Sequence, residues 1–401
     1  MSLTLKRLGL LAPALALLVL CPAGARVAAL EPIAGTGRLI VGTFPDTFWI
    51  IDEATTNVVG TIHYESGIPR RTSMSKDRTR FYTVEAQMEK VEVIDIASRK
   101  TVDKFTLSEG NKHVRIRSVE PDPRHRFLMM VIKTATKLTD RFEIGPPQLV
   151  QYDLAEHKIS RVVPWPNGDE RENANIQFSP DGSLMYLFSD QDVLIYETAG
   201  FTQTDKWELS KPIEEGVGRL NFGSTDSVND EPGFYTGIFN IQDPVQNRRV
   251  MGVGRVNLAA KSVDFYTLGP ATQVGFAMAP NRKFAYGIMS EIGRYEFWKF
   301  DLEKRQLAVR QEFKGRPRMS MKTSSSGKVL YIYNAGATID LYDAETFEFI
   351  KAIQLTENNG HFSLTEYGQV EIPPQYSVAD AVTELFAKKK FSFASQNLRR
   401  A

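Results

Sequence analysis

FWKFDLEKRQL (297–307) begins with alternating apolar residues, reaches Asp301 and continues as a polar turn. The same pattern, an apolar run that ends at an acidic or amide residue, occurs at six other places in the 401-residue chain. Successive copies are separated by 43, 58, 44, 60, 44 and 42 positions. The residues that end the seven runs are Asp52, Asp95, Asp153, Glu197, Asn257, Asp301 and Asp343. Seven copies at this spacing indicate a repeat architecture.

A second mark precedes the first in most copies: a polar turn residue lies five positions before an aromatic residue that begins an apolar strand. SPDGSLMYLF (179–188) shows it most clearly. The pairs are Asp77 and Tyr82, Asp122 and Phe127, Asp181 and Tyr186, Asp230 and Tyr235, Asn281 and Tyr286, and Ser326 and Tyr331. Each unit then contains four strands, A to D, because period-two alternation with Gly, Asp or Asn at the bends favours strands. We predict an all-β fold, a seven-bladed β-propeller of four-stranded blades.

The two ends of the repeat region predict how the ring closes. The first copy, from Arg38, contains strands B, C and D but no strand A. We therefore expect residues 360–365 to supply the innermost strand of the first blade within a propeller of residues 33–368, which removes an open edge. Beyond it, Ser377 and Asp380 form an S-x-x-D cap before apolar residues at helical spacing. This predicts a short C-terminal helical tail at 376–401.

The two long intervals locate insertions between strands B and C of the third and fifth copies. Their sequences are KTATKLTDRFEIGPPQ (133–148) and NIQDPVQNRRVMG (240–252). In a propeller, the B–C and D–A connections emerge on the same face. Long loops on a rigid scaffold are often functional, but a decorative insertion explains these sequences equally well.

The N-terminus predicts export. Lys6 and Arg7 precede an apolar run, Leu8–Leu20, and Ala23-Gly24-Ala25 supplies a small-residue cleavage site. Residues 1–25 are therefore predicted to be a signal peptide, with an apolar run too short to form a transmembrane segment. The only Cys, Cys21, lies inside it. We expect a mature protein without Cys that is periplasmic or secreted.

The chain offers little chemistry of its own. Net charge is +1, which gives no bias toward nucleic acid. The five histidines are scattered, and neither an H-E-x-x-H pair, a C-x-x-C-H haem motif nor a phosphate loop is present. We predict no catalytic residue, no metal ligand and no cofactor in this chain.

Arginines gather where strand D of one blade crosses to strand A of the next. They are Arg70, Arg71, Arg115, Arg117, Arg219, Arg316 and Arg318. These crossovers would place them around one mouth of the ring, as a rim that binds an anion or an acidic partner. The alternative is that each pairs with a neighbouring carboxylate, for example Glu120 or Glu65.

Four stretches resemble the β subunit of quinohemoprotein amine dehydrogenase, a YVTN-type propeller. They are FEIGPPQLVQYDLAEHK (142–158), GFYTGIFNIQDP (233–244), NRKFAYGIMSEIGRYEFWKFDLEK (281–304) and GATIDLYDAETFEFIKAIQLTENNGHFSL (336–364). With the blade spacing, the resemblance covers roughly residues 140 to 366. The first half matches through its blade pattern alone, and the predicted helical tail departs from the family.

The resemblance implies a non-catalytic subunit of a periplasmic complex that oxidises primary amines. In such enzymes a small subunit carries cysteine tryptophylquinone, another carries two c-type haems, and the propeller helps to wall the active site. Two alternatives stay open. One is a stand-alone exported propeller that binds a protein or a surface ligand. The other is a lactonase-like hydrolase, which would need a metal or an acid–base cluster at the ring mouth.

Overall fold

The computed structural model describes residues 33–165, 170–172, 174–188, 192–209, 211, 218, 220–226, 229–243, 245, 247–291, 293–315, 319–333, 337–355, 369–370 and 379–380. The chain divides into Met1–Glu31, which lies outside the described residues, and Pro32–Ala401, which contains the strands. The described residues form strands and turns, with no helix among them.

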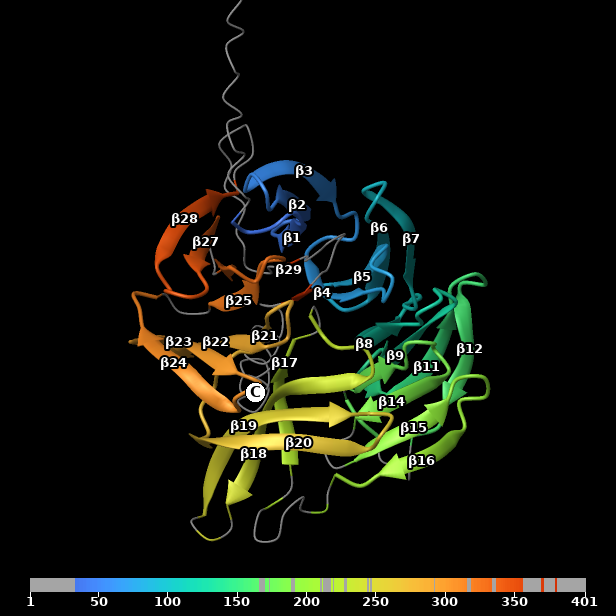
Figure 1. Ribbon diagram of the computed structural model, residues 1–401. Helices are drawn as coiled ribbons and strands as arrows, with labels where there is room; N and C mark the ends of the chain where they lie inside the picture. The colour runs from blue at the N-terminus through green and yellow to red at the C-terminus, as the bar shows by residue number, and fades with distance from the viewer. Residues whose placement is uncertain are drawn as a thin grey trace, which may run out of the picture. The chain divides into compact units, whose positions relative to one another are not determined.

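Strands β1 to β28 form seven antiparallel sheets, which are the blades of a β-propeller (Figure 1). Blade 1 contains β1 (Arg38–Thr43), β2 (Thr47–Asp52) and β3 (Asn57–His63); blade 2 contains β4 (Pro69–Met74), β5 (Arg80–Glu85), β6 (Lys90–Asp95) and β7 (Lys100–Thr106). Blade 3 contains β8 (Lys112–Pro121), β9 (Phe127–Lys137), β11 (Gln148–Asp153) and β12 (Lys158–Val163), with β10 (Phe142–Ile144) added beside β9. Blade 4 contains β13 (Asn175–Phe178), β14 (Leu184–Phe188), β15 (Val193–Glu197) and β16 (Gln203–Trp207).

The remaining strands complete the ring. Blade 5 contains β17 (Leu220–Thr225), β18 (Phe234–Asp243), β19 (Arg248–Asn257) and β20 (Ser262–Pro270). Blade 6 contains β21 (Ala277–Met278), β22 (Phe284–Glu291), β23 (Arg294–Asp301) and β24 (Gln306–Glu312). Blade 7 contains β25 (Ser320–Thr323), β26 (Val329–Tyr333), β27 (Thr338–Asp343) and β28 (Phe349–Gln354). The seven-bladed all-β fold predicted from the sequence is confirmed.

The repeated acidic or amide residue forms the turn between strands C and D in every blade. Its side-chain oxygen accepts a backbone N–H, usually three residues on, as Asp95 does from Ser98 at 2.8 Å. The residue four positions on then has a positive φ in all seven blades. These residues are Thr56, Arg99, His157, Phe201, Lys261, Arg305 and Phe347. The side-chain acceptor fixes the bend, which explains why a short carboxylate or amide recurs there.

The structure of the turn between strands A and B shows that the predicted pair Asp122 and Phe127 in blade 3 is not equivalent to the pair in blade 2. The first residue of this turn donates its N–H to the carbonyl five positions on, from Ser75 to Arg80 in blade 2 and from Asp122 to Phe127 in blade 3. Asp122 therefore corresponds to Ser75 rather than to Asp77, and the predicted pair in blade 3 is displaced by two residues. The reason is chemical: a buried Asp122 carboxylate accepts backbone N–H groups of the turn, as the Ser75 hydroxyl does.

In blade 5 the predicted aromatic residue, Tyr235, lies one position earlier along strand B than Tyr82 does in blade 2. Phe234 pairs with Asn257 there, as Arg80 pairs with Asp95 in blade 2. Tyr235 therefore faces blade 4, whereas Tyr82 faces blade 3. Because side chains alternate along a strand, a shift of one residue reverses the face, and an aromatic residue fits either blade interface.

Apolar side chains seal every pair of neighbouring blades. Blades 1 and 2, for example, meet through Phe48 and Phe81, whose ring centroids are 5.1 Å apart. Blades 7 and 1 close the ring in the same way, with Trp49 and Tyr331 in one buried cluster. Separate clusters join the other neighbours. Tyr331 and the other blade-facing aromatic residues thus belong to the core.

A buried carboxylate adds polar bonds to this closure. Glu53 of blade 1 accepts hydrogen bonds from the Tyr331 hydroxyl at 2.9 Å, from Ser325 N–H at 3.1 Å and from Gly37 N–H at 3.2 Å. Its side chain is fully buried, and burial raises its pKa. Removal of the carboxylate would leave these donors without this acceptor. Because the bonds are buried or part-buried, the loss would cost free energy of folding.

The two ends of each blade carry different connections. The turn face carries the A–B and C–D turns, and the crossover face carries the B–C connections and the crossovers from strand D to the next strand A. Both insertions lie on the crossover face, as predicted. Instead of loops, they lengthen strands: β9 continues to Lys137 and pairs with β10, and β18 pairs with β19 up to Asp243 and Arg248. The inserted residues of each blade thus pair their backbone groups with one another.

Most of the residues in the two C-terminal predictions lie outside the described ranges. Residues 360–365, the predicted closing strand, lie outside the described residues, as does most of the predicted helical tail. Ala379 and Asp380, which the sequence places in the first turn of that helix, are instead β30 (Ala379–Asp380). They pair with β29 (Gln369–Val370), because an antiparallel partner satisfies their backbone groups. β29 contacts β1, and β30 contacts β4.

Candidate functional site

Four of the seven predicted arginines lie on the innermost strands of blades 2 and 3. Arg70 and Arg71 belong to β4, and Arg115 and Arg117 to β8. All four are near the crossover face, where the sequence predicted them. Arg219, Arg316 and Arg318 lie outside the described residues, so their positions stay predictions.

Three of these arginines lie close together. The Arg71 guanidinium donates a hydrogen bond to the backbone carbonyl of Arg117. Burial lowers the pKa of Arg117, and the positive charges of Arg71 and Arg115 lower it further, whereas Glu172 opposes the shift. Arg70 points elsewhere and donates to the carbonyl of Ala86 at 3.2 Å. The structure therefore supports a basic cluster that contains three of the four described arginines.

The backbone explains how Arg117 reaches this cluster. Strand β8 shifts register against β9 between Ile116 and Ser118, which makes Arg117 the extra residue of a β-bulge. A bulge redirects a side chain and often lies beside a functional site. Nothing in the residue pattern predicted it.

A carboxylate shared by two cations partly balances the cluster. Arg117 lies 3.9 Å from Glu172, which also pairs with Lys133 of β9. Neither of the carboxylates expected from the sequence does this: Glu65 pairs with Lys104, and Glu120 lies near Lys76. Among the described residues, Arg115 makes no ion pair. We call Arg71, Arg115, Arg117 and Lys133 the crossover-face cluster. It contains four cations, of which two pair with Glu172.

A second charged group, which the sequence did not predict, lies at the turn face. Lys76 of blade 2 and Asp230 of blade 5 form an ion pair of 3.2 Å across non-neighbouring blades. Burial raises the pKa of Glu120 in blade 3 to about 7, Lys76 opposes this shift and Asp230 adds to it. Burial alone would lower the pKa of Lys76, but Asp230 and Glu120 raise it. Charged side chains from three blades thus meet near the ring axis.

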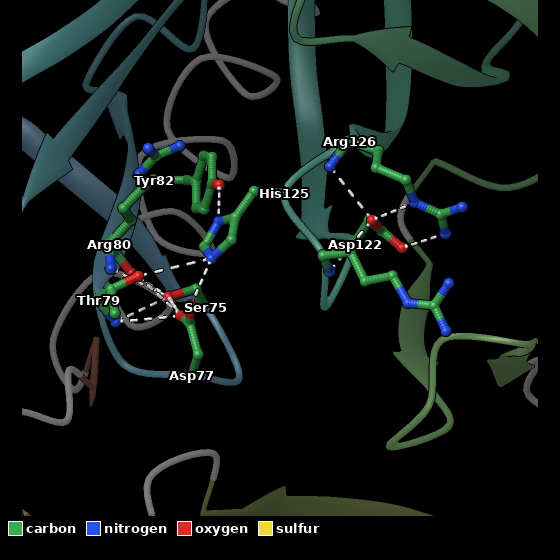
Figure 2. Close-up of polar contacts among 9 residues, drawn as sticks. Ser75, Asp77, Thr79, Arg80, Tyr82, Asp122, His125 and Arg126 are labelled. Atoms are coloured by element: carbon green, nitrogen blue, oxygen red, sulfur yellow. Dashed lines mark hydrogen bonds and ion pairs between the residues drawn. The ribbon is translucent and has the colours of Figure 1, made fainter.

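A histidine joins blades 2 and 3 on the turn face, as Figure 2 shows. His125 Nε2 lies 2.8 Å from the Asp77 carboxylate, and Nδ1 lies 2.8 Å from the Tyr82 hydroxyl. Burial disfavours the charged form of Asp77, but hydrogen bonds from His125, Ser75 and Thr79 outweigh it and lower the pKa of Asp77 to about 2. The Ser75 hydroxyl donates to Asp77 at 2.7 Å and not to the imidazole.

This arrangement differs from a catalytic triad, in which the histidine accepts the proton of the serine. Here the imidazole links the A–B turns of two blades through a carboxylate and a phenol. We interpret it as a brace between the blades. In the sequence, His125 is only a histidine at a turn position. Its contact with Asp77 becomes visible in the fold.

Within the described ranges, no three His, Cys, Asp or Glu side chains are grouped in a way that could hold a metal ion. The part of the chain that the structure describes has no helix with the length and apolar character of a membrane span.

Comparisons with known proteins return no matching family model and no matching curated protein. Solved structures match at low identity. Dihydro-heme d1 dehydrogenase NirN is 12% identical, with a TM-score of 0.46 over 81% of this chain and 74% of that chain. Hydrazine synthase of Kuenenia stuttgartiensis is 14% identical, with a TM-score of 0.44 over 77% and 89%. Apo AztD from Citrobacter koseri is 12% identical, with a TM-score of 0.49 over 82% and 96%. We base no functional inference on these likenesses.

Proposed function

We propose that this chain is a binding subunit whose crossover face docks a protein with an acidic surface. The observation that carries the proposal is the crossover-face cluster. Arg117 and Lys133 share Glu172, Arg71 donates to the Arg117 carbonyl, and Arg115 keeps no ion pair among the described residues. Like charges held together on a surface favour an anionic partner, because the partner removes their mutual repulsion.

We further propose that the partners belong to an exported amine dehydrogenase complex. The support is the sequence resemblance to the β subunit of quinohemoprotein amine dehydrogenase and the N-terminal export pattern. On this proposal the chain walls the active site of a subunit that carries cysteine tryptophylquinone, and a subunit with c-type haems accepts the electrons. The residues of this chain contribute binding and shape rather than a redox group.

The test is the variant Arg115→Ala/Arg117→Ala. Its binding partner is the haem- and quinone-bearing fraction purified from the source organism after growth on a primary amine, monitored by haem absorbance. Association should slow by roughly tenfold at low salt, because charged rims mainly set association rates. The difference should shrink as salt shortens the screening length to about 8–10 Å.

A matched control separates binding from folding. Lys158→Ala/Lys351→Ala removes the same charge from exposed positions on the outermost strands of blades 3 and 7, and it should leave association unchanged. If the arginine variant loses thermal stability while it binds at the normal rate, the cluster is an internal pairing network and the proposal fails. If no haem-bearing partner binds the natural chain, the amine dehydrogenase assignment fails.

A further inference from the structure

The insertion in blade 3 forms a small sheet that extends the blade at the crossover face. It consists of residues 112–116 of β8, residues 133–137 of β9, and β10. β10 pairs with one edge of β9, where Phe142 is opposite Lys137 and Ile144 is opposite Ala135. β8 pairs with the other edge of β9, where Arg115 is opposite Lys133. We call this sheet the blade-3 arm.

The register decides which side chains share a face of the arm. Directly opposite residues in an antiparallel pair point to the same side, and alternate residues of one strand do so too. Lys133, Ala135 and Lys137 alternate along β9, so they share a face with Arg115, Phe142 and Ile144. The presented face of the arm thus holds Arg115, Lys133, Lys137, Phe142 and Ile144. His113, opposite Ala135, is also on this face and lies 3.2 Å from Glu89.

The other face of the arm is anchored. Val114, Ile116 and Ile132 point to that side and are buried in the cluster between blades 2 and 3. The arm is therefore held by the propeller core, and its presented face is positioned by the scaffold. A recognition surface on a rigid element loses little conformational freedom on binding.

The presented face combines features that ordinary surface seldom combines. Phe142 is 62% exposed and Ile144 is 57% exposed, two residues apart on one strand. One exposed apolar residue would be unremarkable, but an aromatic and an aliphatic residue side by side among cations resemble the composition of interfaces. Arg115 and Lys137 make no ion pair among the described residues.

The charge of the face decides between two kinds of occupant. A second copy of the same face would bring the cations Arg115, Lys133 and Lys137 of one copy near those of the other, and like charges at close range oppose such a contact. A different protein with carboxylates around an apolar pocket would satisfy both the cations and the two apolar side chains. The face therefore fits a heterologous, acidic partner.

We propose that Phe142 and Ile144 are the apolar anchors by which this chain holds its partner, inserted into an apolar pocket ringed by carboxylates. The proposal deepens the function above and rests on it, because the same partner contacts the crossover-face cluster. Arginine and lysine set the approach, and the two apolar side chains set how long the complex lasts.

The experiment compares Phe142→Ser/Ile144→Ser with the natural chain against the haem- and quinone-bearing fraction. Both side chains are exposed, so the variant should fold and melt normally. We expect binding to weaken by at least tenfold, mainly through faster dissociation. Val245→Ser is the matched control, because Val245 is an 84% exposed apolar residue in the blade-5 insertion. It should bind normally.

The possible outcomes separate the two proposals. Unchanged dissociation of the Phe142→Ser/Ile144→Ser variant, together with slow association of Arg115→Ala/Arg117→Ala, overturns the anchors and leaves the proposed function intact. Absence of any haem-bearing partner overturns the amine dehydrogenase assignment and, with it, the anchors for that partner. Analytical ultracentrifugation adds one more decision: a dimer of the natural chain that the serine variant abolishes would assign the face to a second copy and overturn the acidic partner.

Discussion

Lys76 and Asp230 act on the pKa of Glu120 in opposite directions, since Lys76 lowers it and Asp230 raises it. Burial dominates and raises the pKa of Glu120 from an ordinary 4.5 to about 7. A carboxyl group whose pKa is raised in the folded state stabilises the fold when it is protonated. That contribution is complete below the unfolded pKa and disappears as pH rises through the folded pKa.

We therefore expect stability to depend on pH through this residue. Relative to the Glu120→Gln variant, in which the side chain stays neutral, the natural chain should lose free energy of unfolding between pH 5 and pH 8, by at most about 3 kcal/mol. Urea denaturation of both chains at the two pH values measures this difference. Glu348→Gln, at an exposed position, should show no such trend. A constant difference between the Glu120→Gln variant and the natural chain at both pH values would contradict the prediction.

Which of these residues the sequence could predict depends on separation along the chain. The arginines of the crossover-face cluster recur at a fixed place in the repeat, so the repeat located Arg71, Arg115 and Arg117. Lys76 and Asp230 are 154 residues apart and belong to blades that are not neighbours. No periodic pattern reports a contact across a ring, and the bulge that redirects Arg117 leaves no mark in the residue types.

Among the turns, too, some were predictable from the sequence and others were not. The C–D turn was predictable in all seven blades because one side-chain acceptor specifies it. The A–B turn was predictable in fewer blades, since different side chains can begin it. Asp122 replaces a serine there and displaces the pattern by two residues, and Tyr235 displaces it by one. Local rules transfer between blades only where a single chemical group performs the task.

The C–D turn can be tested in blade 2. Asp95→Ala removes the acceptor of the Ser98 N–H at 2.8 Å and of the Ser98 hydroxyl at 2.7 Å. We expect the free energy of unfolding to fall by about 1 kcal/mol, the typical net value of such bonds. Asp95→Asn is the control, because Asn257 accepts the equivalent bond at 3.0 Å in blade 5. Equal losses in the Ala and Asn variants, measured by urea denaturation, would show that the turn does not depend on this acceptor.

Ring closure belongs to the whole molecule. The buried cluster that contains Trp49 and Tyr331, together with the bonds to Glu53, joins the last blade to the first. Figure 1 shows these two blades, with β28 and β1–β3, next to each other. Blade 1 nevertheless has three strands among the described residues, and no ladder is found there on the inner edge of β1. Its sequence predicts the missing strand at 360–365, whereas β29 (Gln369–Val370) contacts β1 in the structure.

Two truncations decide which segment covers that edge. Deletion of 360–401 removes both candidates, and we expect aggregation or loss of folding, because an uncovered strand edge pairs with other chains. Deletion of 366–401 keeps the predicted strand and removes β29 and β30. If residues 360–365 close blade 1, the shorter deletion should leave a monomer that melts cooperatively, as size-exclusion chromatography and calorimetry would show. If it aggregates as the longer deletion does, Gln369–Val370 or its neighbours cover the edge and our assignment of the closing strand is wrong. A stable, monomeric product of the longer deletion would mean that the cluster between blades 7 and 1 closes the ring without any fourth strand in blade 1.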